Sequence, residues 1–249
     1  MSDSLAMIDR SLRLSVRNVD ALITSLALPV LMMLIFVFLF GGAVNTGGGG
    51  AYVQYVVPGV LVLCAGFGAG NTAIRVTQDM TGGIIDRFRS LDVSPTAILV
   101  GHVTASLARN LAASALVFGV ATAIGFRSQA TFPGLLAAAA VLLAFILAIS
   151  WVGAAVGLLA KSPEAASGFT FFIAFLPYPS SGFVPVQTMP SWIHGFAENQ
   201  PITPVIEALR GLLLDQPVGA APWLALAWCA GIVAVGMTAS ATMFRRRTS

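Results

Sequence analysis

Three observations predict an all-α polytopic membrane protein with six transmembrane helices. The first is composition, because 57% of the 249 residues are hydrophobic, only 9% are charged and the mean hydropathy is +0.89. So few charged side chains do not cover a soluble globule of this size. The second is a series of apolar runs close to the roughly 20 residues that cross a bilayer core of about 30 Å. The third is the gathering of basic residues on one side of those runs.

Residues 1–20 are predicted to form an amphipathic helix. Leu5, Ile8, Leu12 and Val16 recur at spacings of three or four, while arginines occupy another side. Such a helix suits the membrane interface, where arginines meet headgroups and the leucine face enters the acyl boundary. A cytosolic helix packed on a partner fits the same pattern, so both interpretations stay open. The acidic, polar start of the chain does not resemble a cleaved signal peptide.

Six apolar runs are predicted to be the transmembrane spans. The fifth run is the weakest, because Pro177, Pro179 and Pro185 interrupt it and part of its length must come from an irregular segment. The third run carries His102 and Arg109, whose roles the sequence leaves open. The expected spans are residues 21–40, 52–73, 97–125, 133–159, 165–183 and 222–244.

Residues 184–214 are neither a clean span nor an ordinary loop. Prolines alternate there with short apolar runs and with Trp192, Glu207 and Arg210. Two short helices that enter one leaflet and return fit this pattern, provided that protein packs around their backbone. We therefore expect re-entrant helices here, with Trp192 at headgroup level.

The basic residues predict the orientation. With six spans, ten of them fall on one side and only Arg127 and Arg210 on the other, while Arg109 lies inside the third span. By the positive-inside rule, both termini then face the cytoplasm. The ten are Arg10, Arg13, Arg17, Arg75, Arg87, Arg89, Lys161, Arg245, Arg246 and Arg247.

The motifs of several enzyme classes are missing from the sequence. The glycines at 47–50 run into Ala51 and Tyr52 without the Lys-Ser/Thr pair of a phosphate-binding loop, and no HExxH metalloprotease motif occurs. Ser167 and His194 are expected on opposite sides of the membrane, too far apart for a nucleophile and its base. No expected span contains an acidic residue, which weighs against an ion-coupled carrier without excluding it. We expect no catalytic residue and no metal site.

The densest run of charge lies between the second and third spans, from Asp79 to Asp92. After Gly82 and Gly83, the residues Ile84, Ile85, Phe88 and Leu91 share one face of a two-turn helix. Such a helix is either a solvated interfacial linker or a docking element for a cytosolic partner that supplies energy. The residues alone leave both readings open.

Two motifs carry a resemblance to a known family. The first is Asp79-x-x-Gly82-Gly83-Ile84-Ile85-Asp86-Arg87-Phe88-Arg89-Ser90-Leu91. The second runs from Ser181-Gly182-Phe183-Val184-Pro185 to Met189-Pro190 and continues in Glu198-Asn199-Gln200-Pro201. Together with the order of spans along essentially the whole chain, they resemble the type-2 ABC exporter permeases, and most closely the daunorubicin-resistance (DrrB-like) branch.

This resemblance implies a single transmembrane domain over residues 1–249. Residues 1–20 would be its connecting helix, 78–92 its cytoplasmic coupling helix and 184–214 its outer re-entrant region. The implied ATPase-coupling residues are Asp79, Gly82, Gly83, Ile84, Asp86, Arg87, Phe88 and Arg89. The implied residues of the outer region are Phe183, Pro185, Met189, Pro190, Trp192, Glu207 and Arg210.

The resemblance also implies the partners of the chain. These are two copies of a separate ATPase subunit that binds ATP and Mg, a second permease of the same or related sequence, and the lipids of a prokaryotic cytoplasmic membrane. The chain itself would bind no cofactor and no nucleic acid. The cargo expected first is an amphipathic or hydrophobic molecule such as a drug, a polyketide or a lipid, because apolar walls without acids suit it. The alternatives are export of a lipid-linked glycan or envelope lipid, and a receptor or immunity module that transports nothing.

Overall fold

The computed structural model describes residues 19–44, 51–82 and 95–248. The expected amphipathic helix therefore lies outside the described residues, apart from Val19 and Asp20, which begin the first described helix. Most of the charged stretch, from Gly83 to Asp92, lies outside them as well.

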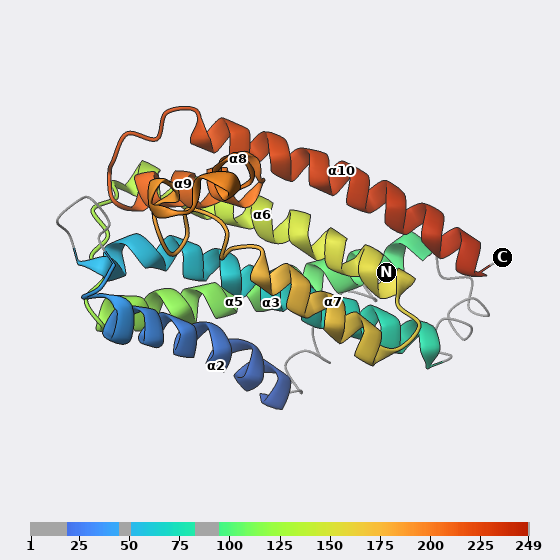
Figure 1. The fold of residues 1–249 in the computed structure, drawn as a ribbon. Coiled ribbons are helices and arrows are strands. Elements are labelled where there is room, and N and C mark those ends of the chain that lie inside the picture. Colours follow the sequence, from blue (N-terminus) through green and yellow to red (C-terminus); the bar gives the residue numbers. More distant parts are fainter. Residues whose placement is uncertain (1–18, 45–50, 83–94, 249) are drawn as a thin grey trace.

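The described residues fold into helices joined by turns and loops, without strands. The long helices run side by side, and two short ones gather at one end of the bundle (Figure 1). The elements are α2 (Val19–Ile35), the π-helical turn η1 (Phe36–Phe40), α3 (Tyr52–Thr81), α5 (Pro95–Ala123), α6 (Phe132–Leu159), α7 (Pro163–Phe175), the 3-10 turn η2 (Val186–Thr188), α8 (Ser191–Asn199), α9 (Ile202–Leu213) and α10 (Ala221–Thr248).

Local sequence explains where α6 and α7 begin. The Thr131 hydroxyl accepts a hydrogen bond from the Gly134 amide at 3.3 Å, and the Ser162 hydroxyl accepts one from Ala165 at 3.3 Å. In each case a proline follows the cap in the first turn, where its missing N–H costs nothing. Ser162 also hydrogen-bonds Glu164 and so holds the pKa of that exposed carboxyl below its usual value.

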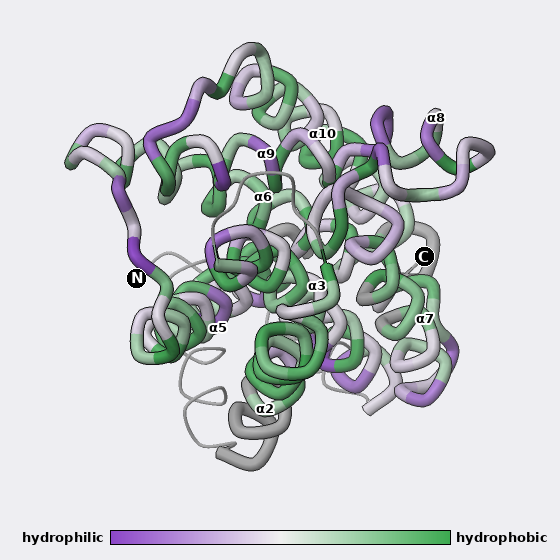
Figure 2. The backbone as a smooth tube through the Cα atoms, turned by 60° about the vertical axis from the view of Figure 1, so that its left-hand side comes forward, coloured by the Kyte–Doolittle hydropathy of each residue, from purple (hydrophilic) through white to green (hydrophobic). Residues whose placement is uncertain are grey.

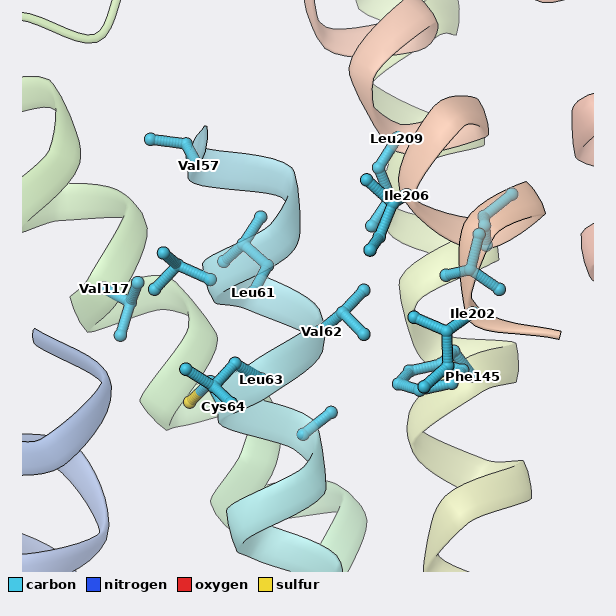
Figure 3. Close-up of a cluster of buried hydrophobic side chains, with 14 of the residues drawn as sticks. Val57, Leu61, Val62, Leu63, Cys64, Val117, Phe145, Ile202, Ile206 and Leu209 are labelled. Atoms are coloured by element: carbon cyan, nitrogen blue, oxygen red, sulfur yellow. The ribbon is translucent and has the colours of Figure 1, made fainter. Parts of the chain in front are cut away.

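Helix α3 is the centre of the bundle. It packs against α2, α5, α6, α7 and α9, and most of its outer two-thirds is buried. Figure 3 shows the arrangement: Leu61 and Val117 lie where α3 faces α5, while Val62 points toward Phe145 of α6 and Ile202 of α9. A helix that is apolar all round is a buried helix, which explains its central position.

Small residues bring α3 and α6 into close contact. A Cβ on Gly153 or Gly157 of α6 would overlap the carbonyl oxygens of Ala69 and Ala73 on α3. The Thr77 hydroxyl donates to the Gly157 carbonyl at 2.9 Å across the same contact. Within a membrane, close backbone approach of this kind supplies the packing that the hydrophobic effect does not.

Four described helices are long and apolar enough to cross a membrane: α3, residues 97–123 of α5, α6 and residues 221–244 of α10. Helix α2 and η1 together cover residues 19–40 and so the whole expected first span, 21–40. Helix α7 has 13 residues and ends at Phe175, before the end of the expected fifth span. The described structure thus supports an all-helical membrane protein. Green, the hydrophobic colour, predominates on the long helices in Figure 2, whereas purple, the hydrophilic colour, is commonest in loops and at helix ends.

Helix α3 extends past the inner end of the expected second span, 52–73. It continues without interruption to Thr81 and so includes residues 78–81, the start of the expected coupling helix. The reason is packing, because Ala73, Val76 and Thr77 are buried. Asp79 consequently lies in the last turn of α3, and Gly82 caps the helix by donating its amide hydrogen to the Gln78 carbonyl at 2.8 Å.

Candidate functional site: the two ends of the bundle

At the inner end, α3 and α5 are joined by a pair of polar side chains. His102 of α5 lies 3.1 Å from a carboxylate oxygen of Asp79, measured from its Nε2 atom, and both side chains are largely buried. The link holds the start of α5 against the end of α3, on either side of the charged stretch. Of the predicted coupling residues, Asp79 and Gly82 are described, whereas Gly83, Ile84, Asp86, Arg87, Phe88 and Arg89 lie outside the described residues.

Further into the bundle, a polar cluster ties three helices together. The Thr72 hydroxyl of α3 donates to Ser106 of α5 at 2.7 Å, and Ser106 lies 2.9 Å from the hydroxyl of Ser150 on α6. Asn110 donates to the Ser106 carbonyl at 3.0 Å, and Arg109 donates to Thr72 at 3.3 Å. Buried polar groups in an apolar bundle are costly unless they are paired, so this cluster fixes how α3, α5 and α6 align.

No local pattern in the sequence predicted this cluster. Gly68 is part of it, because a Cβ there would overlap the Asn110 side chain. The signal that could have found it is one hydroxyl residue in each of three apolar helices at comparable depth. Each residue alone is an ordinary tolerated polar residue, and only the fold brings the three together.

At the outer end, Arg210 of α9 is anchored on α3. Its Nε and Nη2 atoms donate to the Tyr55 carbonyl at 3.3 and 3.2 Å, and Nη2 also donates to the Ser181 carbonyl. The guanidinium carbon lies 3.8 Å from the centre of the Tyr55 ring, a cation–π contact. Arg210 thus joins α9, α3 and the loop after α7, positions separated by as many as 155 residues in the chain.

The segment after α7 is fixed to α3 as well. The Tyr52 hydroxyl donates to the Phe183 carbonyl at 2.7 Å. Gly59 and Gly182 meet backbone to backbone, since a Cβ on Gly59 would lie 2.7 Å from the Gly182 carbonyl oxygen. The predicted outer residue Phe183 is buried, and its carbonyl is bound to α3.

An aromatic cluster joins the first helix to this segment. The rings of Phe36 and Phe183 are 4.6 Å apart, Tyr178 stacks on Phe183 at 4.8 Å, and Phe175 lies 5.3 Å from Tyr178. These four residues, here called the outer aromatic cluster, link η1, the end of α7 and the loop that follows it. Aromatic rings with centroids about 4.5 to 7 Å apart attract one another and stabilise the fold beyond the effect of burying their surface.

The remaining predicted outer residues have different environments. Pro185 occupies the N-cap position of η2, and Pro190 that of α8. The Met189 carbonyl lies 2.8 Å from Nε2 of His194. Trp192 is 81% exposed, and Glu207 is exposed on α9. Of the predicted outer residues, Phe183 and Arg210 thus contact α3, whereas Trp192 lies exposed at the surface.

Comparison with known proteins identifies the family to which the chain belongs. The model of the ABC-2 type transporter family matches residues 3–214, most of the chain. The chain belongs to the ABC-2 type transporter family. Members of this family are membrane permeases of ABC transporters, so the ABC-2 chain described here is a multi-pass membrane subunit. Its membership of the family also implies an ATPase partner subunit.

Three relatives of this ABC-2 chain are permeases named for drug resistance. It is 30% identical to the daunorubicin resistance ABC transporter permease protein DrrB1 of Streptomyces coeruleorubidus, over 92% of this chain and 81% of the relative. It is 27% identical to the probable doxorubicin resistance permease DrrC of Mycobacterium tuberculosis, over 100% of this chain and 90% of the relative. It is 25% identical to DrrB of the same organism, over 90% and 83%.

Proposed function

We propose that this chain is the permease subunit of an ATP-driven exporter that moves an amphipathic or hydrophobic molecule, a drug, polyketide or lipid, out of a prokaryotic cell. The observation that carries the proposal is the likeness to drug-resistance permeases over nearly the whole chain. The apolar character of the described helices supports a hydrophobic cargo. Both termini face the cytoplasm in this proposal, as the distribution of basic residues predicts.

The energy for export comes from ATP hydrolysis by a partner subunit. Two copies of a separate ATPase subunit bind ATP and Mg, and residues 78–92 dock on them, with Asp86 and Arg87 as central charges. The Asp79–His102 contact supports this role because it joins the two helices that flank the stretch. A movement of residues 83–94 caused by the ATPase would displace α3 and α5 together. The hydrogen bonds of the polar cluster would transmit this displacement to α6.

A second permease, of this or a related sequence, completes the pathway. The cargo passes between the two permeases along faces of the first, second and fifth spans. The outer aromatic cluster lies between the first helix and the end of α7, where such a pathway must open at its outer end. Residues 184–214 form the outer re-entrant cap, which Arg210 holds on α3. Opening and closing of the ATPase pair would rock these elements between two states.

The test of this proposal uses the double variant Asp86→Asn with Arg87→Gln, in the complex with its ATPase. We expect assembly to persist and the stimulation of ATP hydrolysis by daunorubicin, taken as a probe cargo, to be lost. The matched control removes the same two charges at the outer end, with Arg127→Gln and Asp215→Asn, both exposed. If the Asp86 and Arg87 variant exports daunorubicin at the parental rate, the coupling assignment is wrong.

A further inference from the structure

A cavity of about 360 Å³ lies between α5 and α6, and its lining includes neither Arg210 nor any residue of the outer aromatic cluster. Its floor is made by Leu61 of α3 and by Leu209 and Leu213 of α9, and Figure 3 shows Leu61 and Leu209 on these two helices. Its volume is at the lower end of the range typical of small-molecule pockets. The other lining residues are Leu111, Ser114, Ala115, Phe118, Leu135, Ala138, Ala139 and Leu142.

One polar atom interrupts this apolar lining. The Ser114 side chain is only 3% exposed, and its hydroxyl has no hydrogen-bond partner in the described part of the chain. Serine in a membrane helix can bond the carbonyl four residues earlier, but no such bond forms here. A buried hydroxyl left unpaired is costly, so Ser114 points to a ligand that brings a hydrogen-bonding group.

The cavity opens toward the membrane. Ala115 and Ala139 line it and are themselves exposed, and the neighbouring side chains of Leu116 and Leu136 are half exposed. These residues belong to helices apolar enough to cross a bilayer, so the surface around the opening meets hydrocarbon. A molecule dissolved in the bilayer can enter sideways, whereas an ion cannot without losing its hydration.

We propose that this cavity, here called the α5–α6 pocket, binds the cargo while it is dissolved in the bilayer. The cargo is then a mainly apolar molecule that enters in its uncharged form and carries a carbonyl or hydroxyl group for Ser114. This inference rests on the proposed export function but adds a binding site within one permease, outside the pathway between two permeases. A lipid acyl chain would fill the apolar walls yet leave Ser114 unpaired, which argues against it.

The test is photolabelling of the assembled complex in lipid nanodiscs with benzophenone, a neutral diaryl ketone that inserts into nearby C–H bonds on illumination. We expect saturable labelling of residues 111–118 and 135–142, read by peptide mass spectrometry. Ala139→Phe should fill the pocket and reduce this labelling at least tenfold. The matched control is Ala140→Phe, on the same helix and exposed but not lining the pocket, which should label like the parent.

Two further measurements separate the possible ligands. Ser114→Ala should raise the benzophenone concentration for half-maximal labelling roughly three- to tenfold, the effect of one neutral hydrogen bond. An exported compound should compete with the label, whereas added phospholipid should not. Equal labelling of the parent and Ala139→Phe, or competition by phospholipid alone, would overturn the proposal.

This design separates the pocket from the proposed function. If the complex exports daunorubicin but α5 and α6 show no saturable labelling, the pocket inference fails and the export function stands. If the pocket labels but ATP drives no export, the assignment as an exporter fails and with it the identity of the ligand as cargo.

Discussion

At the scale of single residues, the molecule is held by a few polar contacts set in an apolar bundle. Arg210 is the clearest, because one side chain makes a cation–π contact and hydrogen bonds to two carbonyls on different segments. Charged hydrogen bonds of this kind are about twice as strong as neutral ones. The position of α9 over α3 therefore depends strongly on one residue.

Replacing Arg210 with alanine should lower the stability of the purified chain. The change leaves the Tyr55 and Ser181 carbonyls without this partner, and we expect a loss of about 2 kcal/mol in unfolding free energy. Thermal unfolding in detergent, followed by tryptophan fluorescence, measures it. Arg127→Ala is the control, since Arg127 bonds only carbonyls of its own loop region at the surface. Equal midpoints for the two variants would show that the anchor contributes nothing.

The sequence pointed to Arg210 and Glu207 as notable charges in an apolar region, but not to Tyr55. The two partners are 155 residues apart, and nothing in either local pattern encodes the contact. The same holds for Thr72, Ser106 and Ser150, which are unremarkable until α3, α5 and α6 come together. Composition and run length predict helices, whereas long-range pairs follow from packing.

At the scale of elements, the contact between α3 and α6 is set by residues without side-chain bulk. Gly153 lies directly against the backbone of Ala69, and Gly157 against Ala73. Small residues in a membrane helix allow close packing, and here the helix that they meet is α3. The extension of α3 to Thr81 follows from the same contact, because burial favours continued helix beyond residue 73.

Gly153→Val should separate α3 from α6. The side chain would overlap the Ala69 backbone, which cannot move without shifting the central helix, so we expect a loss of about 1 to 3 kcal/mol, typical of overpacking. The melting temperature and the elution volume in detergent report it. Gly231→Ala on α10 is the control, because a Cβ there meets nothing within 4 Å and alanine favours helix. A Gly153→Val variant as stable as the parent would contradict the close contact.

At the scale of the whole molecule, the apolar runs and the two motifs predicted a helical membrane permease, and the family match confirms this class. The helices at the first and fifth positions are irregular, since η1 continues α2 as a π-helical turn and α7 ends at Phe175. Proline-rich sequence after Phe175 explains the early end of α7. The α5–α6 pocket had no sequence signal, since an apolar cavity and an apolar core use the same residues.

The most direct test of the central claim is transport in inside-out vesicles that contain this chain and its ATPase. Fluorescent daunorubicin, taken as a probe cargo, should accumulate inside the vesicles when ATP and Mg are added. Omitting either this chain or a functional ATPase should abolish the accumulation. Accumulation that is the same without this chain, or that continues with an ATPase unable to hydrolyse ATP, would contradict the account.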